Sequence, residues 1–591
     1  MVGRLTENVP VDVAERNAEQ HARWLLANIL DFHRREDKAL WWEYFRLSAL
    51  SAEDLLEERL GLAGLVFVGT TGGTAKAPVQ RYSFPMQEIE LRGGEELRSL
   101  GGQKLGTVEE ISFEDRWVDI KKRKDSADVH TDAVFAHQVV STRVLADALI
   151  RIGEYVASNG MVGSGAYQAA RDLLMRAEPR LGAQELKGNH EPTLVAATRI
   201  APHLDGGLLP IQGPPGAGKT HTGARMICNL AQVGKKIGVT ANSHKVIRNL
   251  LDGVIEAADE AGANVRCIQK ISEGEADVPR LQFTTDNAEL LSSIGTTCQV
   301  AAGTAWLWAR PDAFERLDVL FIDEAAQMSL ANVLAVSQSA RNVVLLGDPQ
   351  QLEQPLQGSH PEGTAVSALD HILNGHATIP VNRGLFLEET WRLHPDICAF
   401  TSELFYENRL HARPGLERQK ITSNGRIQGT GLRFLPVVHE DNTSSSTEEA
   451  DQIRDLVTEI LGSNSFWTDR QGVERAVTLE DILIIAPYNA QVFELQDRIK
   501  GARIGTVDKF QGQEAPIVIY SMTTSSYADA PRGMEFLYSS NRLNVATSRA
   551  RCVCVLVGSP VVFEAECRRP RQMQLVNAFC RYLEMATKIE K

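Results

Sequence analysis

The sequence predicts an α/β protein in which two parallel-sheet domains follow one another, after helical segments and a small antiparallel β domain. The main observation is a set of short apolar strands from about residue 190 onward, each followed by small or polar residues and then by a helical stretch. Such strands are typical of parallel sheets covered on both faces. They are LLPIQ (208–212), KIGVTA (236–241), DVLFID (318–323), NVVLLGD (342–348), ILIIAPY (482–488), APIVIYSM (515–522) and CVCVLVG (552–558).

The stretch before these strands has a different pattern. Residues 62–137 contain alternating or β-rich runs separated by pairs of glycine, which predicts a small antiparallel β domain. Residues 12–47 and 138–180 show helical spacing on either side of it. The aromatic side chains of HRREDKALWWEYFRL (33–47) are expected to pack into a core, with a base-stacking platform as the alternative. Later in the chain, Ser446 with Glu449 fits a capping box at the start of a helix.

Composition is that of an ordinary soluble protein. The chain has 591 residues, of which 43% are apolar and 23% charged. It contains no run of 18 apolar residues and no apolar segment near Met1, so we expect no membrane span, membrane partner or signal peptide. A net charge of −14 argues against a protein that coats polyanions over its whole surface, but it leaves room for a local basic groove.

The cysteines give no sign of a metal centre. None of the eight forms a C-x-x-C pair, so zinc, iron–sulfur and disulfide frameworks are unsupported. Cys552 and Cys554 lie two apart on a predicted strand and are expected to act as small buried apolar residues. Free thiols of this kind predict a reducing, cytoplasmic location.

GPPGAGKT (213–220) is a phosphate-loop motif, because it matches G-x-x-x-x-G-K-[ST]. It follows an apolar strand and opens a helical stretch, which is the setting in which this motif holds phosphates. We expect Lys219 to reach the β- and γ-phosphates and Thr220 to hold Mg²⁺ through its hydroxyl. The glycines that would let main-chain N–H groups approach the phosphates are Gly213, Gly216 and Gly218.

Two further strand ends carry candidate catalytic side chains. In LFIDEAAQ (320–327), Asp323 is expected to hold Mg²⁺ and Glu324 to polarise the attacking water as a general base. In LLGDPQQLEQP (345–355), Gln351 is expected to sense the γ-phosphate. The structural alternatives are an acidic pair that caps the next helix and a loop amide that satisfies backbone groups.

These motifs, in this order, resemble those of superfamily 1 helicases over about residues 208–560. The chain looks most like branch 1B, which holds the RNA-surveillance helicase of nonsense-mediated decay. DKALWWEYFRL and VGKKIGVTANSHKVI are similar to the helicase half of bacterial RecB-like nuclease–helicase fusion proteins. The other stretches that carry the resemblance are VTANSHKVIRNLL (239–251), AAGTA (301–305), ETWRLHPDICAFTSELFYENRL (389–410), IAPYNAQV (485–492), IGTVDKFQGQE (504–514) and NRLNVATSRAR (541–551).

The resemblance implies two RecA-like domains with ATP and Mg²⁺ bound between them. It also implies single-stranded nucleic acid as partner, with DNA favoured over RNA, movement from 5′ to 3′, and a nuclease domain or subunit acting in trans. The implied domains are an N-terminal helical stalk (1–61), a small β-barrel, 1B-like domain (62–137), a second helical stalk (138–189), RecA-like domain 1 (190–380) and RecA-like domain 2 (381–591).

The resemblance also assigns roles in the second RecA-like domain. Arg392 would meet the γ-phosphate, and Gly512 would let the main chain approach it closely. Glu514 would accept a hydrogen bond from the ribose. Arg549 would be the arginine finger, a group that accelerates hydrolysis by roughly 10³–10⁵ in well-studied enzymes.

Recognition of the base departs from the family pattern. Trp391 stands where the family often has a tyrosine, and its ring suits stacking on any purine. The N-x-x-Q that reads adenine upstream of the phosphate loop is absent, and Gln184 and Gln212 are imperfect substitutes. Selectivity for adenine therefore stays open.

Four residues are implied as contacts to nucleic acid by the same likeness: Ser243, Thr304, Asn489 and Thr506. Serine and threonine at strand ends also serve as helix caps, which is the structural alternative at these positions.

Two other functions are compatible with parts of the sequence. Asp119-Ile120-Lys121 matches the short D-x-K pattern of nucleases, but no second metal-binding acid lies at a suitable spacing, and residues 117–123 fit a β-strand with a basic outer face. A nucleotide-gated scaffold that binds nucleic acid and recruits a separate nuclease is the alternative to a helicase or translocase.

Overall fold

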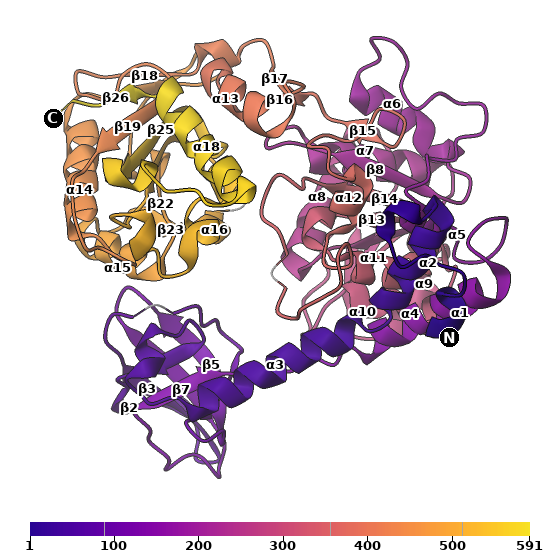
Figure 1. Ribbon diagram of the computed structural model, residues 1–591, viewed down its shortest axis with the longest axis horizontal. Coiled ribbons are helices and arrows are strands. Elements are labelled where there is room, and N and C mark those ends of the chain that lie inside the picture. Colours follow the sequence, from indigo (N-terminus) through magenta and orange to yellow (C-terminus); the bar gives the residue numbers. More distant parts are fainter. Residues whose placement is uncertain (88, 355, 511, 591) are drawn as a thin grey trace. The chain divides into compact units, whose positions relative to one another are not determined.

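The computed structural model describes residues 1–590 except 88, 355 and 511, and it forms two compact units (Figure 1). Unit one comprises residues 1–37, 141–391 and 405–411, and unit two comprises 38–140, 392–404 and 412–591. Among the described residues, no helix combines the length and the apolar character needed to cross a membrane.

Unit one contains a parallel sheet of eight strands in the order β11-β10-β12-β9-β13-β14-β8-β15. Its apolar strands are buried on both faces, as the sequence pattern predicted. The strands are β8 (Leu208–Gln212), β9 (Ile237–Thr240), β10 (Cys267–Lys270), β11 (Leu281–Thr284), β12 (Val300–Ala302), β13 (Leu317–Ile322), β14 (Ala340–Gly347) and β15 (Leu385–Phe386).

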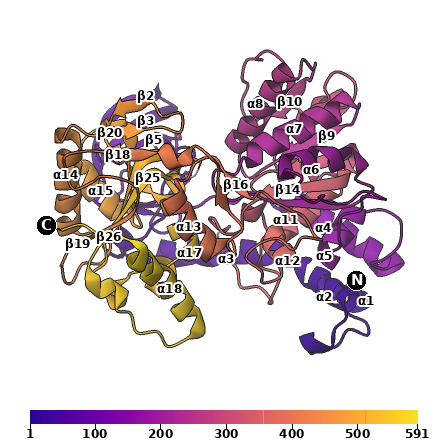
Figure 2. The same cartoon turned by 90° about the horizontal axis from the view of Figure 1, so that it is seen from above.

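Helices cover both faces of this sheet. One core joins α6, α7 and α8 to alternate strand residues such as Leu209 and Val344, and Figure 2 shows α4 and α11 on the other side of the strands. The helices of unit one are α1 (Val2–Leu5), α2 (Ala18–Ile29), α4 (Arg143–Asn159), α5 (Gln168–Met175), α6 (Thr193–Ile200), α7 (Lys219–Gln232), α8 (His244–Glu260), α9 (Asn287–Ser293), α10 (Ala305–Trp308), α11 (Leu330–Ser337) and α12 (Ala368–Leu373).

Unit two contains a second parallel sheet, in the order β23-β22-β24-β25-β19-β26. The fold is therefore α/β with two RecA-like parallel sheets, as predicted. The strands of this sheet and the helices around it are α13 (Pro395–Phe405), whose last residue belongs to unit one, β19 (Gly431–Pro436), α14 (Thr447–Gly462), β22 (Ile482–Ala486), α15 (Asn489–Arg498), β23 (Arg503–Thr506), β24 (Ala515–Ser521), α16 (Gly533–Leu537), α17 (Ser540–Thr547), β25 (Ala550–Gly558), α18 (Pro570–Met585) and β26 (Thr587–Lys588). A separate sheet of three strands contains β18 (Lys420–Thr422), β20 (Phe466–Thr468) and β21 (Glu474–Ala476).

The β-rich stretch forms an antiparallel sheet of seven strands in the order β1-β7-β4-β5-β6-β3-β2. Its inner face packs around Leu62, Tyr82, Leu97, Val118 and Ile120. The strands are β1 (Gly61–Ala63), β2 (Val66–Thr74), β3 (Ala77–Ser83), β4 (Glu96–Ser99), β5 (Lys104–Ser112), β6 (Trp117–Lys122) and β7 (Ala133–Ala136). We call this sheet and its turns the β domain.

The expected N-terminal helix over 12–47 is two helices, with a break at Leu30 and Asp31. Helix α2 begins with a capping box between Asn17 and Gln20, and α3 (Phe32–Ala49) follows and continues into unit two. The prediction that the α3 aromatics pack into a core was wrong for three of them. The exposed fractions are 46% for Trp41, 66% for Trp42 and 59% for Phe45.

Candidate functional site

The phosphate loop lies between β8 and α7 and has the backbone that its glycines allow. Gly216 and Gly218 have φ values of +71° and +81°, which strain other residues. A Cβ on Gly213 would come within 2.2 Å of the Lys219 side chain. Lys219 donates from Nζ to the Gly213 carbonyl at 2.8 Å, so its charged end lies within the loop at the helix N-terminus.

The two predicted carboxylates lie directly after β13. Asp323 is buried, and its Oδ1 accepts the N–H of Glu324 at 2.9 Å. Burial and the charge of Glu324 raise the pKa of Asp323, against the opposing charge of Lys219. Glu324 is more exposed and has a left-handed backbone with φ of +48°. A divalent cation fits this place, because it would favour the charged form of Asp323 that burial disfavours.

A third carboxylate was missed by the sequence analysis. Asp348, at the end of β14, is 1% exposed and accepts hydrogen bonds from Gln351 Nε2 and Tyr406 Oη, both at 2.7 Å. Burial raises the pKa of Asp348, with Lys219, Tyr406 and Gln351 acting the other way. The signal in the sequence was its position after an apolar strand, in line with Asp323. Asp348 therefore holds the predicted sensor Gln351 in place.

Thr390 and Trp391 are hydrogen-bonded to the phosphate loop. Trp391 N donates to the Gly216 carbonyl at 2.9 Å, and Thr390 Oγ1 donates to the Pro215 carbonyl at 3.0 Å. The Trp391 ring is exposed. Its backbone is thus fixed beside the loop.

Two arginines of unit two, Arg392 and Arg551, pair with Glu514, which directly precedes β24. Glu514 accepts from Arg392 on Oε2, and from Arg551 Nε on Oε1 at 3.0 Å. Burial acts to raise the pKa of Glu514, but the charges of Arg392 and Arg551 outweigh it and hold that pKa below its usual value. Both carboxylate oxygens of Glu514 are thus already engaged, although a ribose contact was expected there.

Arg549 lies deeper than Arg551. It is 2% exposed, and its Nη1 donates to the Gln513 carbonyl at 3.3 Å. Gly512 has φ of +80°, a conformation for which glycine is suited. The predicted residues Arg392, Gly512, Glu514 and Arg549 therefore lie together at one end of the unit-two sheet.

The four predicted nucleic-acid contacts are of two kinds. Ser243 caps α8, because its Oγ accepts from Val246 N at 3.2 Å, and Asn489 Nδ2 donates to the Ile89 carbonyl of the β domain at 2.6 Å. Both side chains therefore have structural partners. Thr304 lines a cavity of about 230 Å³ together with Trp306, and Thr506 ends β23.

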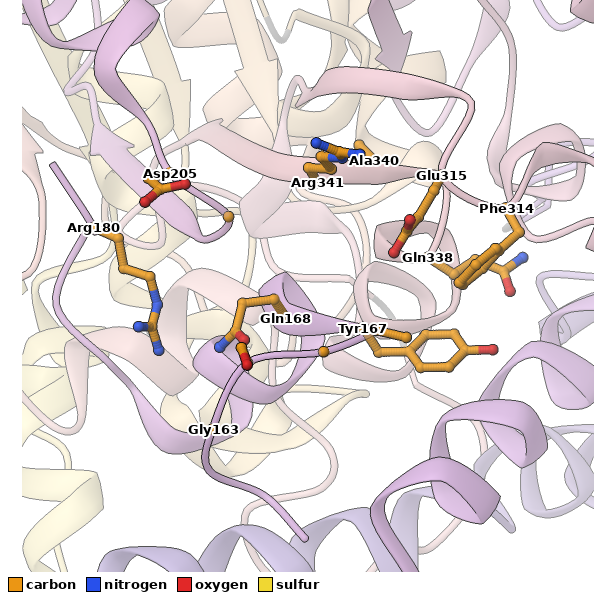
Figure 3. Close-up of a pocket in the computed structure, with 14 residues that line it drawn as sticks. Gly163, Tyr167, Gln168, Arg180, Asp205, Phe314, Glu315, Gln338, Ala340 and Arg341 are labelled. Atoms are coloured by element: carbon orange, nitrogen blue, oxygen red, sulfur yellow. The ribbon is translucent and has the colours of Figure 1, made fainter. Parts of the chain in front are cut away.

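A larger cavity of about 680 Å³ lies where β8, β13 and β14 begin, at the end of the strands opposite to the phosphate loop (Figure 3). Tyr167 and Phe314 pack at one side, with 5.1 Å between ring centroids. Arg180 at the other side is bound to Asp172, with 2.7 Å between Nε and Oδ2. No residue of the phosphate loop lines this cavity.

The nuclease pattern occupies a structural position. Asp119 on β6 is buried and paired with Arg81 through two hydrogen bonds of 2.8 Å. Lys121 is paired with Glu109 at 3.4 Å. These pairs support the reading of residues 117–123 as a β-strand.

Comparison with known proteins gives matches along most of the chain. One family model described as an AAA domain matches residues 196–370, and another with the same description matches 365–561. The putative helicase mov-10-B.1 of Danio rerio is 27% identical over 448 residues, covering 66% of this chain and 43% of that protein. The DNA polymerase alpha-associated DNA helicase A of Schizosaccharomyces pombe is 25% identical over 414 residues, covering 60% and 61%.

A third relative, the DNA replication ATP-dependent helicase/nuclease dna2 of Schizosaccharomyces pombe, is 26% identical over 430 residues, covering 66% of this chain and 29% of that protein. The chain thus spans less than two thirds of the length of each of these relatives. The predicted likeness to superfamily 1 helicases is confirmed. A special relation to RecB-like fusion proteins stays a prediction.

Proposed function

We propose that the chain is an ATP-driven helicase or translocase that moves along single-stranded nucleic acid. The observation that carries this proposal is the shared environment of Lys219, Asp323, Glu324 and Asp348 in unit one. Hydrolysis of a nucleoside triphosphate needs a phosphate loop, a metal-binding acid, a general base and a side chain that senses the γ-phosphate.

Each part has a role in this proposal. The loop N–H groups and Lys219 bind the β- and γ-phosphates, and Thr220 with Asp323 holds Mg²⁺, which neutralises charge on those phosphates. Glu324 takes a proton from the attacking water. Gln351, oriented by Asp348, responds to the presence of the γ-phosphate.

Unit two supplies positive charge. Arg549 acts as the arginine finger and stabilises charge that develops on the γ-phosphate during transfer. Arg392 contacts the same phosphate, Gly512 allows the main chain to approach it, and Glu514 orients Arg392. The Trp391 ring stacks on the base.

The finer parts of the proposal rest on resemblance. DNA as the preferred strand and a nuclease partner follow from the likeness to nuclease–helicase fusion proteins. Movement from 5′ to 3′ follows from the likeness to superfamily 1 helicases of branch 1B. One relative is named as a DNA helicase and another as a DNA replication helicase/nuclease, which supports DNA as the strand. Thr304 and Thr506 are preferred over Ser243 and Asn489 as contacts to the strand, because the side chains of Ser243 and Asn489 already have structural partners.

The test uses the full chain with labelled duplexes that carry a 5′ or a 3′ single-stranded overhang. We expect ATP-dependent unwinding from the 5′ overhang, and stronger stimulation of ATP hydrolysis by single-stranded DNA than by matched RNA. Stimulated hydrolysis without unwinding of either duplex would identify a translocase. Absence of hydrolysis with both strands would refute the proposal.

A further inference from the structure

The cavity of about 680 Å³ at the start of β8, β13 and β14 is separate from the candidate ATP site (Figure 3). All of the residues that line it belong to unit one. Its volume lies within the range of about 300–1,000 Å³ that is typical of small-molecule sites. None of its described lining residues has a role in the proposed hydrolysis of ATP. The cavity therefore has the size of a binding site for a ligand of its own.

One wall of the cavity is the glycine-containing loop 163–167, and a buried arginine fixes the shape of this loop. Arg171 is 1% exposed and is not among the lining residues. Its guanidinium donates to the carbonyl oxygens of Gly163 at 2.8 Å, Ala166 at 3.2 Å and Gly165 at 3.3 Å. Arg171 thus gathers these carbonyls on the side of the loop that faces away from the cavity.

The main-chain N–H groups of the same loop point the other way. In a trans peptide the N–H lies opposite to the preceding carbonyl, so the N–H groups of Ser164, Ala166 and Tyr167 are directed away from Arg171. In the part of the chain that the structure describes, no group accepts a hydrogen bond from these three N–H groups. All three residues line the cavity. Successive N–H donors in a concave loop attract an anion.

Charged side chains of both signs line the rest of the cavity. Arg341, at the start of β14, is exposed and has no ion pair among the described residues. Arg180 also lines the cavity, but its charge is balanced by Asp172. The carboxylates of Asp205 and Glu315 are lining groups as well. They would repel additional negative charge, so the cavity favours a ligand with one phosphate over a ligand with several.

Aromatic rings occupy one side of the cavity. The ring centroids of Phe314 and Tyr167 are 5.1 Å apart, and Tyr167 lies 5.5 Å from the ring of Tyr155. Figure 3 shows the Phe314 and Tyr167 rings together, with Arg180 at the other side. Phe314 is 37% exposed, so part of its ring is open to a ligand. A flat heteroaromatic ring can stack on it.

We propose that this cavity is a second ligand site, which binds a small molecule that joins one phosphate to a heteroaromatic ring, as a nucleoside monophosphate does. The phosphate accepts hydrogen bonds from the N–H groups of loop 163–167 and from Arg341, and the ring stacks on Phe314. Asp205 accepts a hydrogen bond from a sugar hydroxyl. The inference goes beyond the proposed function and does not depend on hydrolysis of ATP.

Isothermal titration calorimetry of the full chain with AMP, GMP, adenosine and ribose 5-phosphate tests both halves of the site. We expect a nucleotide to bind more tightly than adenosine, which lacks the phosphate, and more tightly than ribose 5-phosphate, which lacks the ring. Lys219→Ala should retain this binding, because Lys219 belongs to the candidate ATP site. Absence of binding of both nucleotides at millimolar concentration would overturn the inference. Binding that Lys219→Ala abolishes would also overturn it, since the nucleotide would then occupy the phosphate loop.

Two exposed side chains of the cavity give variants that should fold, which circular dichroism checks. Arg341→Ala should weaken nucleotide binding by about tenfold and remove the advantage over adenosine, because the phosphate loses a charged donor. Phe314→Ala should weaken it by about fivefold and reduce the advantage over ribose 5-phosphate, because the base loses a stacking partner.

Arg316→Ala is the matched control, since Arg316 is an exposed arginine close to Phe314 in the sequence that does not line the cavity. It should bind the nucleotide as the parent chain does. Equal losses of affinity in Arg341→Ala and Arg316→Ala would overturn the inference, because the nucleotide would then respond to surface charge alone. Parent-like affinity in both Arg341→Ala and Phe314→Ala would overturn it as well.

Discussion

The guanidinium of Arg551 is held by the carboxylate of Glu514, with 3.0 Å between Nε and Oε1. Arg549, two residues earlier, is directed to the main-chain oxygen of Gln513. The charge of Arg551 is balanced by this carboxylate, and the Nη1 of Arg549 meets a neutral carbonyl.

Arg549→Ala should reduce the kcat of ATP hydrolysis by about 10³–10⁵, because the proposed arginine finger stabilises charge only in the transition state. Binding of ATP should be nearly unchanged. Arg551→Ala should have a smaller effect on kcat. Steady-state hydrolysis and binding of a fluorescent ATP analogue measure both quantities. Equal losses of kcat in the two variants would mean that the finger is assigned to the wrong arginine.

Glu324→Gln should reduce hydrolysis by about 10²–10⁴ with ATP binding retained, because an amide cannot act as the general base. Glu315→Gln is the control, since this exposed carboxylate precedes β13, whereas Glu324 follows that strand. If a cellular role of the protein survives in Glu324→Gln without hydrolysis, the scaffold alternative gains support over the helicase.

Tyr406→Phe should lower the free energy of unfolding by about 1–3 kcal/mol, because it removes a hydrogen bond from the buried Asp348 carboxylate. It should also lower the rate of hydrolysis, since Asp348 orients Gln351. Urea unfolding followed by circular dichroism measures the first effect. Tyr527→Phe is the control, because no hydrogen bond of its hydroxyl is found in the part of the chain that the structure describes. Equal stability of parent and Tyr406→Phe would contradict the role given to Asp348.

His33 predicts how stability depends on pH. Burial lowers the pKa of His33 to about 4, with Glu36 opposing and His360 assisting that shift. The unfolded chain therefore binds this proton at a higher pH than the folded chain, so stability is lost as pH falls from about 6.5 toward 4. His33→Gln should reduce the slope of unfolding free energy against pH in this range by the contribution of about one bound proton. Parallel curves for the two proteins would exclude a buried neutral His33.

Parts of the fold were predictable because their causes are local. Continuous apolar runs predicted buried parallel strands, and β8, β13 and β25 lie where LLPIQ, DVLFID and CVCVLVG occur. The spacing of glycines before Lys219 likewise predicted a loop with positive φ values, which Gly216 and Gly218 adopt. Backbone conformation and strand burial follow from side chains a few positions apart.

Other features depend on what packs against an element. The periodicity of 33–47 predicted a helix, but it did not indicate that Trp42 would remain exposed. Ser446 caps α14 as expected, with Oγ accepting from Glu449 N at 3.1 Å. The Glu449 side chain, however, does not complete the predicted capping box. It lies in the core and contacts His439 and Ser521.

The sequence by itself determined the two parallel sheets, the phosphate loop and the order of the motifs, since these depend on short-range backbone and burial preferences. Only the tertiary structure decided which charges meet. Arg392 is hydrogen-bonded to Glu514, 122 residues away in the sequence, and Glu36 to the N–H of Gly358, 322 residues away. Ion pairs and buried hydrogen bonds are set by the packing of distant segments, because a charged side chain is satisfied by any suitable partner that the fold brings near.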